Sequence, residues 1–233
     1  MIRGFSLLEL IVVLTLSVGI LTIVLSSTSE STSYSQKVTT HQQRMEAIFH
    51  TVEMLRSDLT KCGMRLQEAA KFFTFPLFEN SDFSFKVNYG IEKEVLIDDS
   101  HEGEDTLTIN RNDFFNKGKR VVIYDPEREV YEINEVKSRN GDQLTLVNML
   151  QNDYPKNAMV VVLKQVEYKL YSQQNTKALK RKVNKGYFQP LIENVTDFNV
   201  KFYPEAYSVL YRIEINKKEQ VRGYIFLTNM VEK

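Results

Sequence analysis

The sequence predicts an α+β protein in which a long N-terminal helix packs on an antiparallel β-sheet. An apolar run over residues 7–25 and an amphipathic stripe over residues 45–66 indicate the helix. Residues 83–227 instead show the alternation, and the β-branched and aromatic enrichment, of consecutive strands. A helix followed by a series of strands is typical of α+β domains, in which the helix covers one face of the sheet.

The apolar run predicts a transmembrane helix over residues 5–26. Between Leu7 and Leu25 the only strongly polar residue is Glu9. A helix rises 1.5 Å per residue, so about twenty residues cross the roughly 30 Å of bilayer hydrocarbon. A carboxylate in such a helix costs up to roughly 2.5–3.5 kcal/mol at mid-bilayer depth and less near its end. Glu9 therefore predicts a compensating partner.

We expect the helix to continue over residues 27–71. Ser26 to Thr40 is rich in hydroxyl side chains, which compete for backbone hydrogen bonds. No proline precedes Pro76, however, and no glycine lies between Gly19 and Gly63. Apolar residues then recur at steps of three and four. They are Met45, Ile48, Phe49, Val52, Leu55, Leu59, Cys62 and Leu66. This stripe predicts packing on a sheet, with Cys62 as a buried thiol.

Residues 72–233 predict a β-rich globular domain. The expected strands include Phe83 to Val87, Leu107 to Ile109, Val121 to Ile123, Ala158 to Tyr171, Leu179 to Val183, Val195 to Tyr203, Val209 to Ile215 and Val221 to Leu227. Two further runs, Val130 to Val136 and Leu144 to Val147, flank Asn140-Gly141. That dipeptide between alternating segments predicts a type I′ hairpin.

The first ten residues resemble a known signal. Gly4-Phe5-Ser6-Leu7-Leu8-Glu9-Leu10 is similar to the cleavage and methylation signal of type IV prepilins and of the pseudopilins of type II secretion. The resemblance implies that residues 1–4 are a leader, that a prepilin peptidase cuts between Gly4 and Phe5, and that Phe5 is then N-methylated. It also implies that Glu9 pairs with the new amine and directs assembly with other pilin or pseudopilin subunits.

A second resemblance covers more of the chain. Several segments look like the PilW-type minor pilins and the J-type minor pseudopilins, namely 56–59 with 62–63, 121–125, 154–162, 166–170, 179–181, 193–198 and 202–203. Cys62 departs from that group, in which alanine is common before the glycine. The resemblance implies a low-copy subunit near the tip of a type IV pilus or a secretion pseudopilus. It also implies insertion in the bacterial inner membrane with a periplasmic globular domain.

Other interpretations of the N-terminus remain open. Arg3 before an apolar run and the small residues 26–29 are also features of an ordinary secretory signal. The four-residue leader, the long apolar run and Glu9 disfavour that interpretation. The alternative function is a single-pass, membrane-anchored periplasmic binding domain that never polymerises.

An acidic loop is the candidate metal site. Five carboxylates lie within eight residues: Asp98, Asp99, Glu102, Glu104 and Asp105, with His101 between them. Ca²⁺ takes six to eight oxygen ligands, so one interpretation is that this loop binds calcium. The other is a solvated acidic loop without metal, which the missing EF-hand spacing favours.

Composition restricts the remaining classes of function. Lys+Arg and Asp+Glu both number 30, so no overall charge favours nucleic acid. The main basic cluster is Lys177, Lys180, Arg181, Lys182 and Lys185, and strand alternation divides it between two faces. The single cysteine excludes an intramolecular disulfide. No nucleophile and base pair, zinc spacing or phosphate loop is recognisable, so we expect neither a cofactor nor catalysis.

Overall fold

The computed structural model describes residues 7–72, 76–110, 112–173, 176–215 and 219–230, with the backbone alone at residues 7–10, 70–72 and 173. The chain divides into two compact units, residues 1–50 and 51–233. We describe each unit separately.

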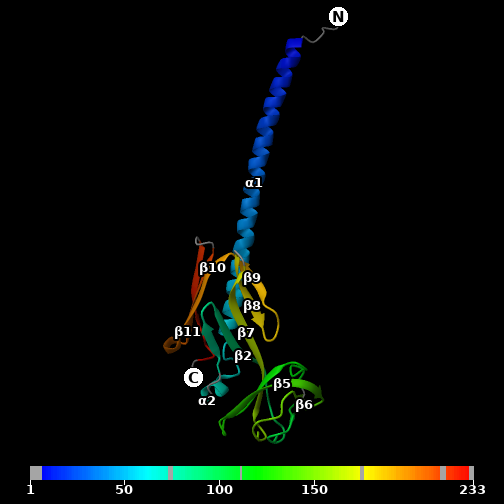
Figure 1. Cartoon of the computed structure of the whole chain (residues 1–233), viewed down its shortest axis with the longest axis vertical. Helices are drawn as coiled ribbons and strands as arrows, with labels where there is room; N and C mark the ends of the chain where they lie inside the picture. The colour runs from blue at the N-terminus through cyan, green and yellow to red at the C-terminus, as the bar shows by residue number, and fades with distance from the viewer. Residues whose placement is uncertain (1–6, 73–75, 111, 174–175, 216–218, 231–233) are drawn as a thin grey trace. The chain divides into compact units, whose positions relative to one another are not determined.

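Helix α1 runs without interruption from Leu7 to Thr60, 54 residues (Figure 1). Its hydroxyl side chains bond back to carbonyls of the preceding turn instead of breaking the helix. Thr28 Oγ1 donates to the Val24 carbonyl at 2.9 Å, and Thr39 Oγ1 donates to the Ser35 carbonyl at 2.9 Å. The hydroxyl-rich segment is therefore helical, as expected.

The helix ends earlier than the expected residue 71. A turn follows Thr60, and a separate helix, α2, spans Gln67–Phe72. Gly63 has a φ of +77°, a left-handed conformation that glycine adopts without strain and that commonly stops helices. The Asn229 side chain donates to the Thr60 carbonyl at 2.7 Å, and Gly63 N–H donates to the Asn88 carbonyl. The Asn229 contact thus satisfies one of the carbonyls that the ending helix leaves unpaired.

The larger sheet in the second unit contains nine antiparallel strands. They are β1 Phe78–Ser81, β2 Ser84–Val95, β3 Thr106–Thr108, β4 Arg120–Asp125, β5 Val130–Asn140, β6 Gln143–Leu146, β7 Met159–Gln173, β8 Thr176–Val183 and β9 Gln189–Glu193. Their order is β1-β2-β7-β4-β5-β6-β3, and β8 joins β7 to β9. The long strand β7 therefore pairs with three neighbours, β2, β4 and β8.

A smaller sheet has the order β10-β11-β12. Its strands are β10 Val195–Tyr203, β11 Ser208–Ile215 and β12 Glu219–Phe226, with the short helix η1 Pro204–Ala206 after β10. All pairs are antiparallel, so the α+β class predicted from the sequence is confirmed.

The predicted hairpin forms, but its loop lies one residue further along the chain. Asn140 pairs with Gln143, so Gly141 and Asp142 make the turn. Gly141 has a φ of +61°, whereas the φ of Asp142 is negative. A positive φ at the first loop position alone fits a type II′ turn, which favours glycine there.

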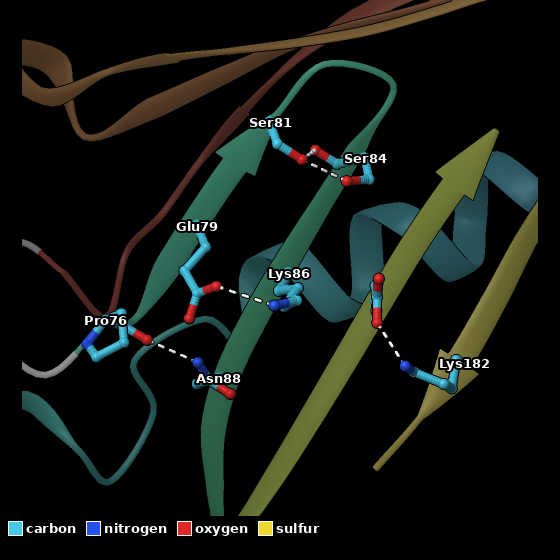
Figure 2. Close-up of polar contacts among 8 residues, drawn as sticks. Pro76, Glu79, Ser81, Ser84, Lys86, Asn88 and Lys182 are labelled. Atoms are coloured by element: carbon cyan, nitrogen blue, oxygen red, sulfur yellow. Dashed lines mark hydrogen bonds and ion pairs between the residues drawn. The ribbon is translucent and has the colours of Figure 1, made fainter. Parts of the chain in front are cut away.

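Polar contacts between neighbouring strands connect β1 to β2 (Figure 2). Lys86 Nζ lies 3.1 Å from Glu79 Oε2, and Asn88 Nδ2 donates to the Pro76 carbonyl at 2.6 Å. Beneath them, Phe85 stacks on Tyr168 of β7 with ring centres 4.9 Å apart. The last turns of α1 bury Leu55 and Leu59 completely. The C-terminal end of α1 is therefore part of the core of the second unit.

Candidate functional site: the exposed apolar helix and its attachment to the sheets

The most unusual surface of the chain is the apolar part of α1. The large apolar side chains of residues 11–25 are between 47% and 68% exposed. They surround the helix instead of forming one stripe, which is typical of a helix buried in lipid or among other helices. Among the described residues, the helix over residues 11–60 is long and apolar enough to cross a membrane. An apolar N-terminal helix of this kind is typical of a single-pass membrane anchor or of a signal sequence.

The polar groups inside this segment are compatible with such burial. Thr15 Oγ1 donates to the Ile11 carbonyl at 3.0 Å, and Thr22 Oγ1 donates to the Val18 carbonyl at 2.8 Å. A hydroxyl that is hydrogen-bonded within its own helix needs no water. Neither threonine therefore opposes transfer into an apolar environment.

The structure does not test the processing signal predicted from the sequence. Gly4 and Phe5 lie outside the described residues. Glu9 belongs to the first turns of α1, and its backbone alone is described. Cleavage, methylation and the ion pair of Glu9 thus stay predictions from the sequence.

A buried carboxylate attaches the end of α1 to the larger sheet. Asp58 is 4% exposed and accepts hydrogen bonds from three side chains of β2, β7 and β8. Tyr168 Oη lies 2.7 Å and Arg181 Nε 2.8 Å from Asp58 Oδ2. Arg181 Nη2 lies 3.2 Å and Tyr89 Oη 3.4 Å from Asp58 Oδ1. Both carboxylate oxygens are thereby satisfied, by a forked guanidinium and two phenols.

The electrostatics of this network follow from burial and from the charge of Asp58. Burial, and then the nearby Asp58 carboxylate, raise the pKa of Tyr168 and of Tyr89. Burial acts to lower the pKa of Arg181, but its hydrogen bond and attraction to Asp58 outweigh this, so that pKa is raised. The phenols thus stay neutral donors and the guanidinium stays charged at neutral pH. We call these four side chains, Asp58, Tyr89, Tyr168 and Arg181, the anchor network.

The sequence analysis did not identify the anchor network, although one signal was present. Strand alternation places Arg181 on the same face of β8 as Leu179, which is fully buried. A charged residue on an apolar face predicts a buried partner. That partner, Asp58, is 123 residues away in the chain, and only the fold brings the two together.

Cys62 is buried just beyond the end of α1, as the apolar stripe predicts. It has no exposed surface, and its Sγ lies 3.2 Å from the Leu77 carbonyl oxygen. Burial raises the pKa of Cys62 to about 12. The side chain is therefore a neutral thiol that packs as a small apolar group.

Two carboxylates of the acidic loop accept hydrogen bonds from backbone groups. Asp99 Oδ1 accepts from Lys156 N–H at 2.6 Å, and Glu104 Oε2 accepts from His101 N–H at 3.0 Å. Asp153, outside the predicted set, accepts from Glu102 N–H at 2.9 Å. In the described part of the chain, no three His, Cys, Asp or Glu side chains converge as metal ligands. This holds for the candidates Asp98, Asp99, Glu102, Glu104 and Asp105.

The basic cluster of β8 is distributed among separate partners. Arg181 belongs to the anchor network, and Lys182 Nζ lies 2.7 Å from Glu167 Oε2 (Figure 2). Lys185 pairs with Glu135, and Lys180 lies over the ring of Tyr171. Lys177 donates to the Thr196 carbonyl. These contacts leave little converging positive charge for a phosphate backbone.

Comparison with protein-family profiles and with curated proteins finds no match. The architecture itself, a long apolar N-terminal helix followed by antiparallel sheets, is pilin-like.

Proposed function

We propose that this chain is a minor pilin or minor pseudopilin, a subunit that assembles into a type IV pilus or a type II secretion pseudopilus through helix α1. The observation that carries the proposal is the apolar surface of residues 11–25 on a helix that continues into a sheet domain. The processing signal at Gly4, Phe5 and Glu9 supports it from the sequence.

The apolar surface supports two successive environments. In the precursor, residues 5–26 span the bacterial inner membrane once, and the sheet domain faces the periplasm. On assembly, the same side chains leave lipid and pack among the helices of other subunits. Burial of this surface is favourable in both environments, so the exchange between them needs a directional contact.

Glu9 supplies that contact in our proposal. Cleavage after Gly4 creates an α-amine on Phe5, four residues from Glu9. The amine and the carboxylate are each costly alone in an apolar medium, and their pairing offsets much of the cost. Pairing between neighbouring subunits would fix the axial position of each helix.

The anchor network supports a mechanical role for the end of α1. Any filament held together through its helices must carry force from α1 into the sheet domain. The hydrogen bonds of Asp58 to three different strands connect the two directly. In this proposal the chain is a substrate of prepilin peptidase and a structural subunit, and it needs no cofactor.

Mass spectrometry of the mature chain, purified from membranes of the producing cells, tests the proposal. The expected N-terminus is Phe5 carrying one added methyl group. A chain that still begins at Met1, or one cleaved after the apolar run, would contradict the pilin assignment. An intact precursor would instead favour the second candidate, a non-polymerising membrane-anchored domain, because that candidate uses the same apolar helix without processing.

A further inference from the structure

The smaller sheet exposes one complete strand edge. Strand β12 pairs with β11 in unbroken register, from Glu219 opposite Ile215 to Phe226 opposite Ser208. Within the described residues no strand pairs with the other edge of β12. The outward N–H and C=O groups of an edge strand can pair with a further strand.

The edge carries few of the features that normally prevent such pairing. β12 contains no proline, and its pairing with β11 shows no bulge. A glycine inside a strand can mark a bulge, but Gly223 is explained by packing. A Cβ at this position would lie 2.6 Å from the Tyr211 hydroxyl oxygen on the buried face. The glycine therefore reflects packing beneath the sheet and does not mark an interrupted edge.

The outer face beside this edge is aromatic. Tyr224 and Phe226 are each 65% exposed and point to the same face, two residues apart. Leu210, directly opposite Tyr224, is half-buried, and Lys201 lies opposite Leu210 on β10. Adjacent exposed aromatic and aliphatic side chains are typical of protein-docking surfaces.

Arg222 lies next to the aromatic pair, with the Glu214 carboxylate diagonal to it on the same outer face. Arg222 is directly opposite Arg212, and like charges in that position repel. Arg212 Nη2 lies 2.7 Å from Asp197 Oδ2, so its charge is compensated. In the described part of the chain, Arg222 forms no ion pair. A carboxylate arriving at the free edge would be attracted to Arg222.

We propose that β12 is a docking edge for an extended strand of another protein chain, which adds to the smaller sheet and places a carboxylate against Arg222. Main-chain hydrogen bonds hold the added strand, while Tyr224 and Phe226 contact its apolar side chains. The β12 strand of a second copy of this chain fits poorly. The outer-facing residues of β12 are Gln220, Arg222, Tyr224 and Phe226, so the same strand offers no carboxylate on that face.

A peptide-binding experiment on the full-length chain in lipid nanodiscs tests this inference. The probe is a fluorescent eight-residue peptide that alternates threonine and valine and carries one central glutamate. We expect it to bind and to slow amide hydrogen exchange in residues 219–226. A lysine version and a version N-methylated on its backbone should each bind about tenfold more weakly, because they lose the charge contact and the main-chain hydrogen bonds, respectively. Empty nanodiscs measure binding to lipid.

Two charge-reversal variants provide the matched comparison. Arg222→Glu should exchange the preference, so that the lysine peptide binds more tightly than the glutamate peptide. Lys137→Glu makes the same charge change at an exposed position of β5 and should leave the preference unchanged.

Three outcomes would overturn the inference. In the first, the N-methylated peptide binds as tightly as the parent peptide. In the second, Arg222→Glu still prefers the glutamate peptide to the lysine peptide. In the third, amide hydrogen exchange in residues 219–226 slows as protein concentration rises, without any peptide present. The last outcome would identify a second copy as the occupant. None of these measurements depends on processing at Gly4, so failure here is distinguishable from failure of the proposed function.

Discussion

Breaking the anchor network by Asp58→Ala should destabilise the second unit by about 3 kcal/mol. Removing one partner of a buried ion pair typically costs about 3–5 kcal/mol, because the other charge stays buried without compensation. The Asp58 side chain is 5% exposed and that of Arg181 is 20% exposed. Since water partly reaches Arg181, we expect a loss near the lower end of that range.

The assay is urea unfolding of the full-length chain in mild detergent. The chain has no tryptophan and 12 tyrosines, so near-UV circular dichroism of tyrosine reports the folded core. Arg181→Met and the double variant complete a cycle. The double variant should lose about 2 kcal/mol less than the sum of the single losses, because residues in one ion-pair network are coupled.

An exposed pair supplies the control. Arg212 and Asp197 lie as close as 2.7 Å, but their side chains are 48% and 29% exposed. Asp197→Ala should therefore cost less than about 1 kcal/mol. Equal losses for Asp58→Ala and Asp197→Ala, or additive losses in the Asp58 and Arg181 cycle, would refute the role assigned to the anchor network.

Further predictions concern Cys62, alkaline pH and Gly90. Because burial raises the pKa of Cys62 to about 12, the native thiol should resist iodoacetamide at pH 8 and react once urea unfolds the chain, as peptide mass spectrometry can show. The unfolded chain loses this proton at lower pH than the native chain. The contribution of Cys62 to the free energy of unfolding should therefore be fully present below the unfolded thiol pKa of about 8.5. Above that pH the free energy of unfolding should fall by about 1.4 kcal/mol per pH unit. The stability of Cys62→Ala is compared across pH by urea unfolding. Its decline should begin nearer pH 10, where tyrosines that are buried in the native chain ionise in the unfolded chain. In Gly90→Ala the new Cβ would lie 2.5 Å from Val161 Cγ1 and 2.9 Å from Arg65 Cβ, so the thermal midpoint should fall, with an overpacking cost of about 1–3 kcal/mol. Gly19→Ala, where a Cβ would meet no atom within 4 Å, should leave that midpoint unchanged.

The sequence predicted the elements whose signals are local. The α+β class, helix α1, the β5–β6 hairpin and the long central strands all follow from periodicity over a few turns or residues. Two strands were missed. β1 is only four residues long and half exposed, and β9 contains Pro190, which is tolerated because β9 lies at an edge of the sheet.

Features that depend on distant contacts were not predictable. The end of α1 at Thr60 combines a local signal, Gly63, with the Asn229 side chain from the far end of the chain. The division of the strands into two sheets depends on pairing between remote segments. In contrast, the prediction of processing at Gly4, Phe5 and Glu9 needs the sequence alone, because a cleavage signal of this kind is a linear motif.

The most direct test of the central claim is incorporation of the chain into filaments. Filaments sheared from cells that make wild-type chain, Glu9→Ala or Glu9→Gln are compared by quantitative immunoblot, with the amount in the inner membrane as reference. We predict equal membrane insertion for all three chains and much lower incorporation of both variants, because each removes the charge that pairs with the Phe5 amine. Equal incorporation of all three chains, or no wild-type chain in the filaments, would contradict the account.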